Sequence, residues 1–387
     1  MIKAQRTQWA MILALVLVGL NLRPSMAGIG PLVNAVQTDI STSYSMLSLL
    51  TTLPVLVMGF AMLYGMRFAI WFGERRCVAL GLMIIAIANF ARFYTDDMMD
   101  LILTAVIAGV GIAIIQSVIP TLIKKNFVNS VPLFMGVYVS AIMGGAALAA
   151  STVTYIEIYL HSWRATLAIW SILAAVAFSI WLFVFPDTQK SSLKQTDIIK
   201  YDSLVRNPRA WLLGIFFGLN TSAYTCVLAW LPAYYLEQSW QSTRAGLLLA
   251  FVTFIEVIAG LTIPAIANKK KDRRPILFFL IFSLMIGFIG LMFAPIQYSL
   301  LWAGLLGLGI GGLFPMSLIV AMDQVESASG AGQLTSFVQG IGYLIAGCAP
   351  FFAAYIRDAS SSFYFSWLLL IMMSIIMIAM APRFSPR

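Results

Sequence analysis

Residues 19–31 read Gly-Leu-Asn-Leu-Arg-Pro-Ser-Met-Ala-Gly-Ile-Gly-Pro and continue an apolar run from Trp9. If this segment crosses a membrane, Arg23 lies near the middle of the bilayer. A charge at that depth costs from about 3 to more than 10 kcal/mol, so such a residue faces a wet cavity or a partner. Pro24 removes a backbone donor beside Arg23 and weakens the helix there, which is tolerated where the backbone lines a cavity. The stretch therefore predicts a binding site at Arg23.

The composition places the chain in a bilayer. Of its 387 residues, 61% are hydrophobic and 10% are charged, whereas soluble domains are about 25% charged. The net charge of +9 could suggest nucleic-acid binding, but the basic residues lie in short stretches between apolar runs. Such a distribution is typical of the positive-inside bias of membrane proteins, so we expect no nucleic-acid partner.

About 20 apolar residues are needed for a helix to cross the hydrocarbon core, and we count twelve such segments. The polar residues 186–209 separate the sixth segment from the seventh, and they are too few for a further domain. The twelve predicted spans are Trp9–Val36, Met46–Phe72, Cys77–Arg92, Leu101–Ile123, Pro132–Ile156, Arg164–Phe185, Ala210–Leu236, Arg244–Ala267, Ile276–Ala294, Ser299–Met322, Gln333–Ile356 and Phe363–Ala381.

Alternate connections differ sharply in charge. With the N-terminus inside the cell, nineteen Lys and Arg residues fall on the cytoplasmic side and four on the other, namely Arg92, Arg164, Arg244 and Arg357. This asymmetry predicts a multi-pass membrane protein with both termini in the cytoplasm.

The two halves of the chain repeat each other at a nearly constant offset. Gly19-Leu20-Asn21 aligns with Gly218-Leu219-Asn220, and residues 109–112 align with residues 307–310. We therefore expect an all-α membrane protein of two parallel six-helix halves, residues 1–185 and 210–387, joined by a cytoplasmic linker at 186–209. Repeats of this kind place a substrate site at the midplane between the halves.

Several motifs resemble those of a known family of transporters. They are Asn21-Leu22-Arg23-Pro24, Ala229-Trp230-Leu231-Pro232, Gly311-Gly312-Leu313-Phe314-Pro315 and Gln339-Gly340-Ile341-Gly342-Tyr343. The chain resembles a major facilitator superfamily transporter along its whole length, and within it the bacterial cyanate and nitroimidazole transporter family. The resemblance implies transport of small anions or small polar heteroaromatics, inward or outward, across the bacterial inner membrane. One departure is that Ala69 and Ile70 stand where the superfamily's signature loop has an Asp.

Arg23 is the strongest candidate for binding a solute, because a guanidinium can hold a planar anion through paired hydrogen bonds. Its alternative role is structural. Asn21 is a second candidate, provided that the kink at Pro24 turns it toward Arg23.

Glu256 alone among the fifteen acids lies deep within a predicted span. Burial would favour its neutral form, so it could carry a coupling proton. A carboxyl that stays neutral and bonds a neighbouring helix is the competing explanation.

Polar residues in other predicted helices complete the set of candidate solute contacts. Members of the pairs Asn220/Tyr224 and Gln339/Tyr343 are four residues apart and share a helix face, and interhelical hydrogen bonds explain them equally well. Gln116 and Tyr138 lie in segments with which the superfamily builds its cavity.

The sequence offers no site for a cofactor or a metal. Gly307-x-Gly309-x-x-Gly312 matches a dinucleotide fingerprint, but no strand precedes it, so we attribute it to close helix packing. A single His and no clustered acids argue against a membrane enzyme. We expect a monomeric secondary transporter in contact with lipid, driven by a solute gradient or by protons as a symporter. The alternative is an exporter of neutral heteroaromatic drugs such as nitroimidazoles.

Overall fold

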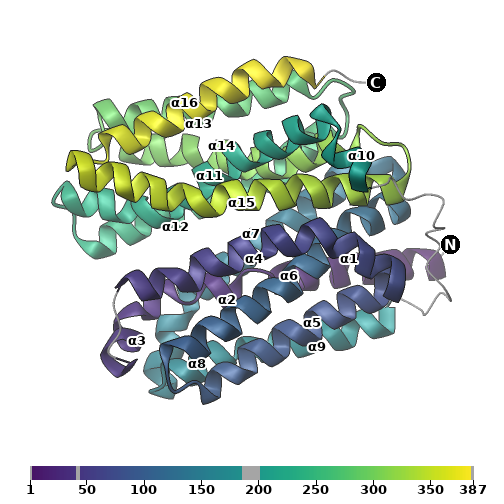
Figure 1. Cartoon of the computed structure of the whole chain (residues 1–387), viewed down its shortest axis with the longest axis horizontal. Coiled ribbons are helices and arrows are strands. Elements are labelled where there is room, and N and C mark those ends of the chain that lie inside the picture. Colours follow the sequence, from purple (N-terminus) through teal and green to yellow (C-terminus); the bar gives the residue numbers. More distant parts are fainter. Residues whose placement is uncertain (1, 41–43, 185–200, 385–387) are drawn as a thin grey trace. The chain divides into compact units, whose positions relative to one another are not determined.

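The computed structural model describes residues 2–40, 44–184 and 201–384, and within these ranges the chain is helical with no strand (Figure 1). Contacts group the described residues into two compact units. Unit 1 runs to Leu122 and from Ala141 to Val184, and unit 2 comprises Ile123–Ser140 and the residues from Tyr201 onward. Most of the predicted linker at 186–209 lies outside the described residues.

Unit 1 begins with a broken helix and contains most of the first six predicted spans. Its elements are α1 (Ile2–Leu20), α2 (Pro24–Ala27), the 3-10 turn η1 (Gly30–Leu32), α3 (Val33–Ile40), α4 (Tyr44–Phe72), α5 (Glu74–Ala91), η2 (Arg92–Tyr94), α6 (Met98–Asn126), α7 (Val131–Leu160), α8 (Trp163–Ala168) and α9 (Trp170–Val184). The last residues of α6 and the first ten of α7 belong to unit 2, as does η3 (Val128–Ser130) between them.

Unit 2 contains the remaining six spans. Its elements are α10 (Tyr201–Val205), α11 (Pro208–Glu237), α12 (Ser242–Ala267), α13 (Arg274–Phe293), α14 (Ser299–Met322), α15 (Ala328–Ser360), α16 (Tyr364–Met380) and η5 (Ala381–Arg383). Within it α11 packs along α15, α12 and α13 both pack on α14, and α13 packs on α16.

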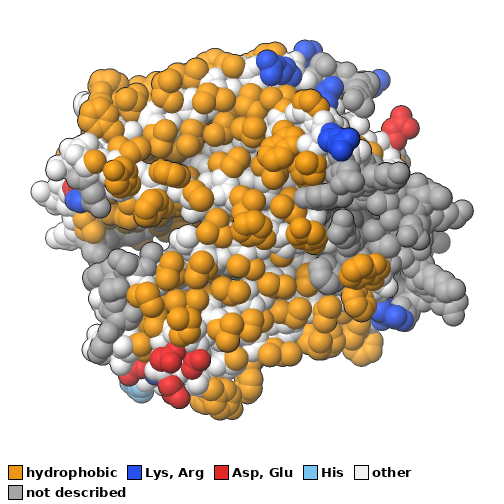
Figure 2. All heavy atoms as spheres, viewed as in Figure 1, with side chains coloured by type: hydrophobic (Ala, Val, Ile, Leu, Met, Phe, Trp, Pro, Cys, Tyr) orange, Lys and Arg blue, Asp and Glu red, His pale blue; other side chains and the backbone are white. Residues whose placement is uncertain are grey.

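The described residues confirm a membrane protein with many spans. Eleven helical segments are long and apolar enough to cross a bilayer, and a shorter apolar stretch, Leu49–Tyr64, lies in α4. In Figure 2 apolar side chains cover the middle of the visible face, while Lys, Arg, Asp and Glu gather toward its ends. Such a surface is stable against lipid tails because the helices satisfy their own backbone polar groups.

In unit 1 an ion pair holds α3 to α8. Arg164 bonds the Asp39 carboxylate, and Trp163 donates from Nε1 to Asp39 Oδ2 at 3.1 Å. These bonds lower the pKa of the exposed Asp39 below its ordinary value, with the Arg164 hydrogen bond the largest cause. Arg164 also donates from Nε to Thr95 O at 2.6 Å. The Trp163-Arg164 pair thus anchors the segments around α8.

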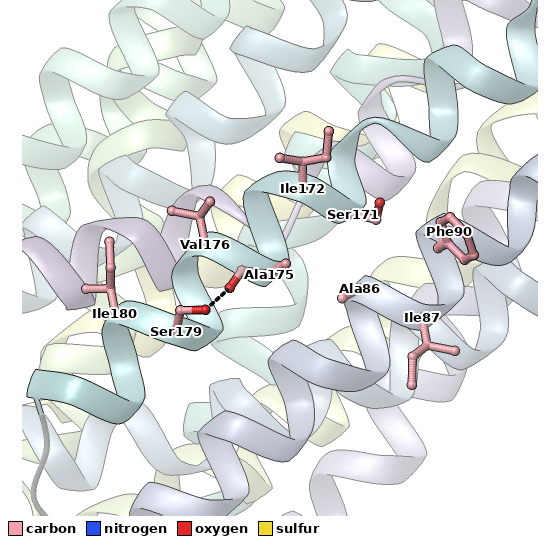
Figure 3. A pocket seen from close by; sticks show the side chains of 9 residues that line it. All are labelled: Ala86, Ile87, Phe90, Ser171, Ile172, Ala175, Val176, Ser179 and Ile180. Carbon is pink, nitrogen blue, oxygen red and sulfur yellow. Dashed lines mark hydrogen bonds between the residues drawn. The ribbon is translucent and has the colours of Figure 1, made fainter.

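A groove of about 600 Å³ runs between α5 and α9 in unit 1. Figure 3 shows its lining of mainly apolar side chains, including Ile87 and Phe90 on α5 and Ile172 and Val176 on α9. The hydroxyl of Ser179 donates to Ala175 O of its own helix at 2.9 Å. With these four apolar side chains all more than 40% exposed, the groove has the character of a lipid-facing surface and not of a polar solute site.

The glycines of α14 let neighbouring backbones come close. A Cβ on Gly307 would lie 2.6 Å from Val252 O of α12, and one on Gly309 would lie 3.0 Å from Leu280 O of α13. The Gly307-x-Gly309-x-x-Gly312 pattern therefore serves helix packing, as predicted. At its end α14 is capped by Lys124, which donates from Nζ to Met322 O at 2.7 Å and to Val325 O.

We predict that Gly311→Ala will destabilise unit 2, whereas Gly246→Ala will not. A Cβ on Gly311 would meet Glu256 Cα and O at 2.4 Å each, so backbones must move apart, while nothing lies within 4 Å of a Cβ on Gly246. Overpacking costs about 1–3 kcal/mol, which lowers the melting temperature by about 5 °C. Thermal unfolding of both variants in detergent measures this. Equal melting temperatures would contradict the close contact.

Candidate functional site

The first predicted span breaks at Asn21-Leu22-Arg23. Helix α1 ends at Leu20, and the backbone N–H groups of Asn21 and Leu22 donate to Val18 O and Gly19 O, at 3.1 Å each. Pro24 then takes the first position of α2, where a missing N–H costs no helical hydrogen bond. The proline thus sets the break beside Arg23, as its position in the sequence predicts.

Arg23 lies at the N-cap position of α2 and is 6% exposed. Its Nη1 donates to Met26 Sδ at 3.8 Å, a weak acceptor within the same turn. A guanidinium buried this deeply in a predicted span has the character expected of a functional charge.

Asn21 helps to hold the break. Its Nδ2 donates to Leu17 O of α1 at 2.7 Å and reaches Leu173 O of α9 at 3.4 Å. The first bond replaces part of the interrupted ladder, and the second ties the break to another helix. These bonds give Asn21 a structural role. Its contact with a solute stays a prediction. Gln116, the third candidate in unit 1, is buried in α6.

In unit 2 the side chain of Asn220 is buried without hydrogen bonds. Asn220 lies in α11 with 0% exposure, and neither Nδ2 nor Oδ1 has a partner among the described residues. Thr221 and Ser222 beside it instead donate to Phe217 O and Gly218 O of their own helix, at 2.8 Å each. An amide left unpaired inside a protein costs about 1–3 kcal/mol, so a ligand or water is expected to bond it.

Aromatic rings lie close to this part of α11. Tyr224 is one helical turn beyond Asn220 and 7% exposed. The Phe217 ring packs edge-on against Tyr343 of α15, with centroids 5.6 Å apart, and 5.1 Å from Phe314 of α14. Gln339, one turn before Tyr343, is 2% exposed. Both predicted polar pairs are thus buried in unit 2.

Glu256 is 2% exposed in α12, and its Oε2 has no hydrogen-bond partner among the described residues. The backbone of Glu256 lies against Gly311 of α14. Ser140 of α7 donates to the carbonyl of the next residue, Val257 O, at 3.1 Å. Tyr138, the remaining candidate, is also buried in this part of α7.

Arg92 is a buried cation that the sequence reasoning assigned to an external connection. It has 0% exposure; Nε donates to Thr104 Oγ1 at 3.3 Å, and neither Nη1 nor Nη2 has a partner among the described residues. The sequence contained a sign of this, since Arg92 follows Asn89 of α5 by three residues, and Asn89 is also buried. Arg92 is therefore a second buried cation besides Arg23.

Comparisons with known proteins identify the family. The family model described as "Major Facilitator Superfamily" matches residues 11–347. The chain belongs to this superfamily. It is 37% identical over 376 residues to the "Cyanate transport protein CynX" of Escherichia coli (strain K12), covering 97% of each chain. The "2-nitroimidazole transporter" of the same organism is 28% identical, with 91% of this chain and 89% of that protein covered.

Solved structures agree with this assignment. The superfamily's proton:xylose symporter XylE aligns with a TM-score of 0.78 at 14% identity, covering 98% of this chain and 96% of that one. The major facilitator fold predicted from sequence is confirmed. This superfamily member is a secondary transporter of small solutes and not an enzyme.

We predict that Asn220→Leu will impair transport while preserving or raising stability. Leucine removes an unpaired amide whose burial costs about 1–3 kcal/mol, but it also removes the group that would bond a solute. Thr221→Val is the matched control, because Thr221 is equally buried and bonds only its own helix. Solute flux and melting temperature of both variants show whether the Asn220 amide serves transport or stability. A stability loss in Asn220→Leu, with flux unchanged, would make the amide structural.

Proposed function

We propose that this transporter moves a small anion of the cyanate class across the bacterial inner membrane by alternating access. The observation that carries the proposal is the buried Arg23 guanidinium at a helix break, 6% exposed. A guanidinium recognises small anions through charge-assisted hydrogen bonds. The 37% identity to the cyanate transport protein over nearly the whole chain supports the same solute class.

The remaining roles extend this proposal. Asn220, Tyr224, Gln339 and Tyr343 contribute uncharged donors and aromatic surface, with Asn21, Gln116 and Tyr138 as further contacts. The distribution of Lys and Arg supports an orientation with both termini in the cytoplasm. The working unit is a monomer surrounded by lipid.

Export of small neutral heteroaromatics is the second candidate. It is favoured by the ring contacts of Phe217 with Tyr343 and Phe314 in unit 2, and by the similarity to the 2-nitroimidazole transporter. Aromatic pairs stabilise stacked rings by about 0.5–1.5 kcal/mol beyond the area they bury, so such a cluster could hold a planar solute.

Transport by purified protein in liposomes separates the two candidates. Uptake and efflux of cyanate and of 2-nitroimidazole are measured with and without a pH gradient, against protein-free liposomes. Flux of cyanate supports the anion proposal, flux of 2-nitroimidazole alone supports the second candidate, and flux of neither rejects both.

We predict that Arg23→Lys will fold but lose most anion transport. Lysine keeps the charge and loses the planar fork, and a lost charge-assisted hydrogen bond of about 1.5–3 kcal/mol lowers flux by about tenfold or more. The measurement is initial anion flux in liposomes, with melting temperature as the folding control. Normal flux in both Arg23→Lys and Arg23→Gln would show that Arg23 is architectural.

We also predict that Glu256→Gln will abolish accumulation driven by a pH gradient while leaving solute exchange intact. Glutamine mimics the protonated carboxyl, so the solute still binds and crosses, but no proton moves with it. Glu326→Gln is the control, because Glu326 is an exposed acid outside the spans. Accumulation as strong in Glu256→Gln as in the unaltered protein would remove this acid from coupling.

A further inference from the structure

The turn η2 after α5 has the features of a membrane interface. The apolar span Glu74–Tyr94 ends there, and the rings of Phe90, Phe93 and Tyr94 are 49–65% exposed. Exposed aromatic rings gather at the depth of the lipid headgroups. An arginine at this depth ordinarily extends its charged end toward water. Arg92 stands among these residues in the sequence, yet its side chain has 0% exposure and bonds inward to α6.

Hydrogen bonds hold both the backbone and the side chain of Arg92. Its Nε donates to Thr104 Oγ1 of α6 at 3.3 Å, and the Thr104 hydroxyl donates to Leu101 O at 2.7 Å. The carbonyl of Arg92 accepts from Thr95 Oγ1 at 2.9 Å, and Thr95 O accepts from Arg164 Nε at 2.6 Å. The position of the guanidinium is therefore fixed on its Nε edge.

The other two nitrogens of the guanidinium have no such bonds. Neither Nη1 nor Nη2 of Arg92 has a hydrogen-bond partner among the described residues. The amide oxygen of Asn89, one helical turn earlier and 1% exposed, is also unpartnered there. Buried donors of a charged group are costly to leave unpaired, so an acceptor is expected beside them. The Asn89 amide is neutral, so it supplies no counter-charge even where it bonds the guanidinium.

Within the part of the chain that the structure describes, no carboxylate pairs with Arg92. Asp97 is exposed and accepts from the backbone N–H of Asp100 at the start of α6. Asp39 is bound to Arg164. The C-terminus of α5 contributes a negative charge of only about half a unit. A buried charge is unfavourable unless a counter-charge and hydrogen-bond acceptors compensate it, and here both are incomplete.

We propose that Arg92 holds a small inorganic anion, of the size of chloride, as a resident counter-ion within unit 1. Nη1 and Nη2 both donate to the ion, and such charge-assisted hydrogen bonds are about twice as strong as neutral ones. The enclosed position suits a single ion and not an organic solute. The ion enters from the water at the interface that Phe90 and Tyr94 mark. This site is separate from the proposed solute contacts and does not depend on the proposed function.

Thermal unfolding of the purified full-length protein in detergent tests the site. The protein is dialysed into sodium gluconate, whose anion is too large for the site, and sodium chloride then replaces gluconate at constant ionic strength. A ligand that binds only the folded state stabilises it by mass action. We expect the melting temperature to rise by about 2–4 °C in chloride. An unchanged melting temperature would show that water alone serves Arg92 and would overturn the proposal.

Three substitutions locate the ion. Arg92→Met removes the guanidinium from a chain of similar length, so we expect the chloride-dependent rise to disappear. Thr104→Val is nearly isosteric and removes the acceptor that fixes Nε, so the chloride concentration that gives half the rise should increase by about fivefold. Arg23→Met is the matched control, because it removes the other buried cation and should leave the rise intact.

Two results from these variants would overturn the proposal. A rise that persists in Arg92→Met, or that disappears in Arg23→Met, would place the anion elsewhere. If Arg92→Met does not fold, an unchanged half-rise concentration in Thr104→Val would exclude the Arg92 guanidinium as the ligand. Cyanate flux in liposomes is a separate readout, so the proposed function can fail while the chloride-dependent rise stands, and the reverse.

Discussion

The cost of placing charge and amide groups inside a membrane governs this structure. Arg23, Glu256 and Asn220 are each at least 94% buried, and a bilayer offers no water to replace the hydration they lose. The helix break at Arg23 exists under that constraint. It needs Pro24 to end the backbone ladder and Asn21 to restore one of the lost bonds. Local sequence and distant packing thus cooperate to hold one cation.

Close backbone approach supports unit 2. Lipid tails are as apolar as leucine, so helices in a membrane associate through tight packing and interhelical hydrogen bonds. The glycines of α14 allow tight packing, with the backbone of Glu256 against Gly311. Hydroxyl groups provide interhelical hydrogen bonds, as where Ser140 donates to Val257 O. The backbone of Glu256 therefore lies at a tightly packed helix contact.

The sequence predicted the spans well because hydropathy depends on composition alone. Helix α14 has the predicted bounds, Ser299–Met322. The tertiary partners of individual side chains could not be predicted from the sequence. Arg92 was assigned to a connection, yet it is fully buried. Lys124 was counted only as one of the cytoplasmic cations, yet it caps α14. The same limit applies to α15, where the spacing of Gln339 and Tyr343 predicted a shared helix face but not that both side chains are buried.

Charged and uncharged donors are distributed unequally among the candidate residues. Unit 1 contains the Arg23 guanidinium, whereas the buried candidates of unit 2 are an acid and neutral polar or aromatic groups. A carrier must release what it binds, so binding cannot be strong along the whole route. In the proposed site one cation would give selectivity for an anion, and neutral groups such as Asn220 and Gln339 would add hydrogen bonds without a second full charge. Substitution of the neutral residues, with the cation unchanged, would then alter which small polar solute fits. Related chains could come to carry different solutes in this way.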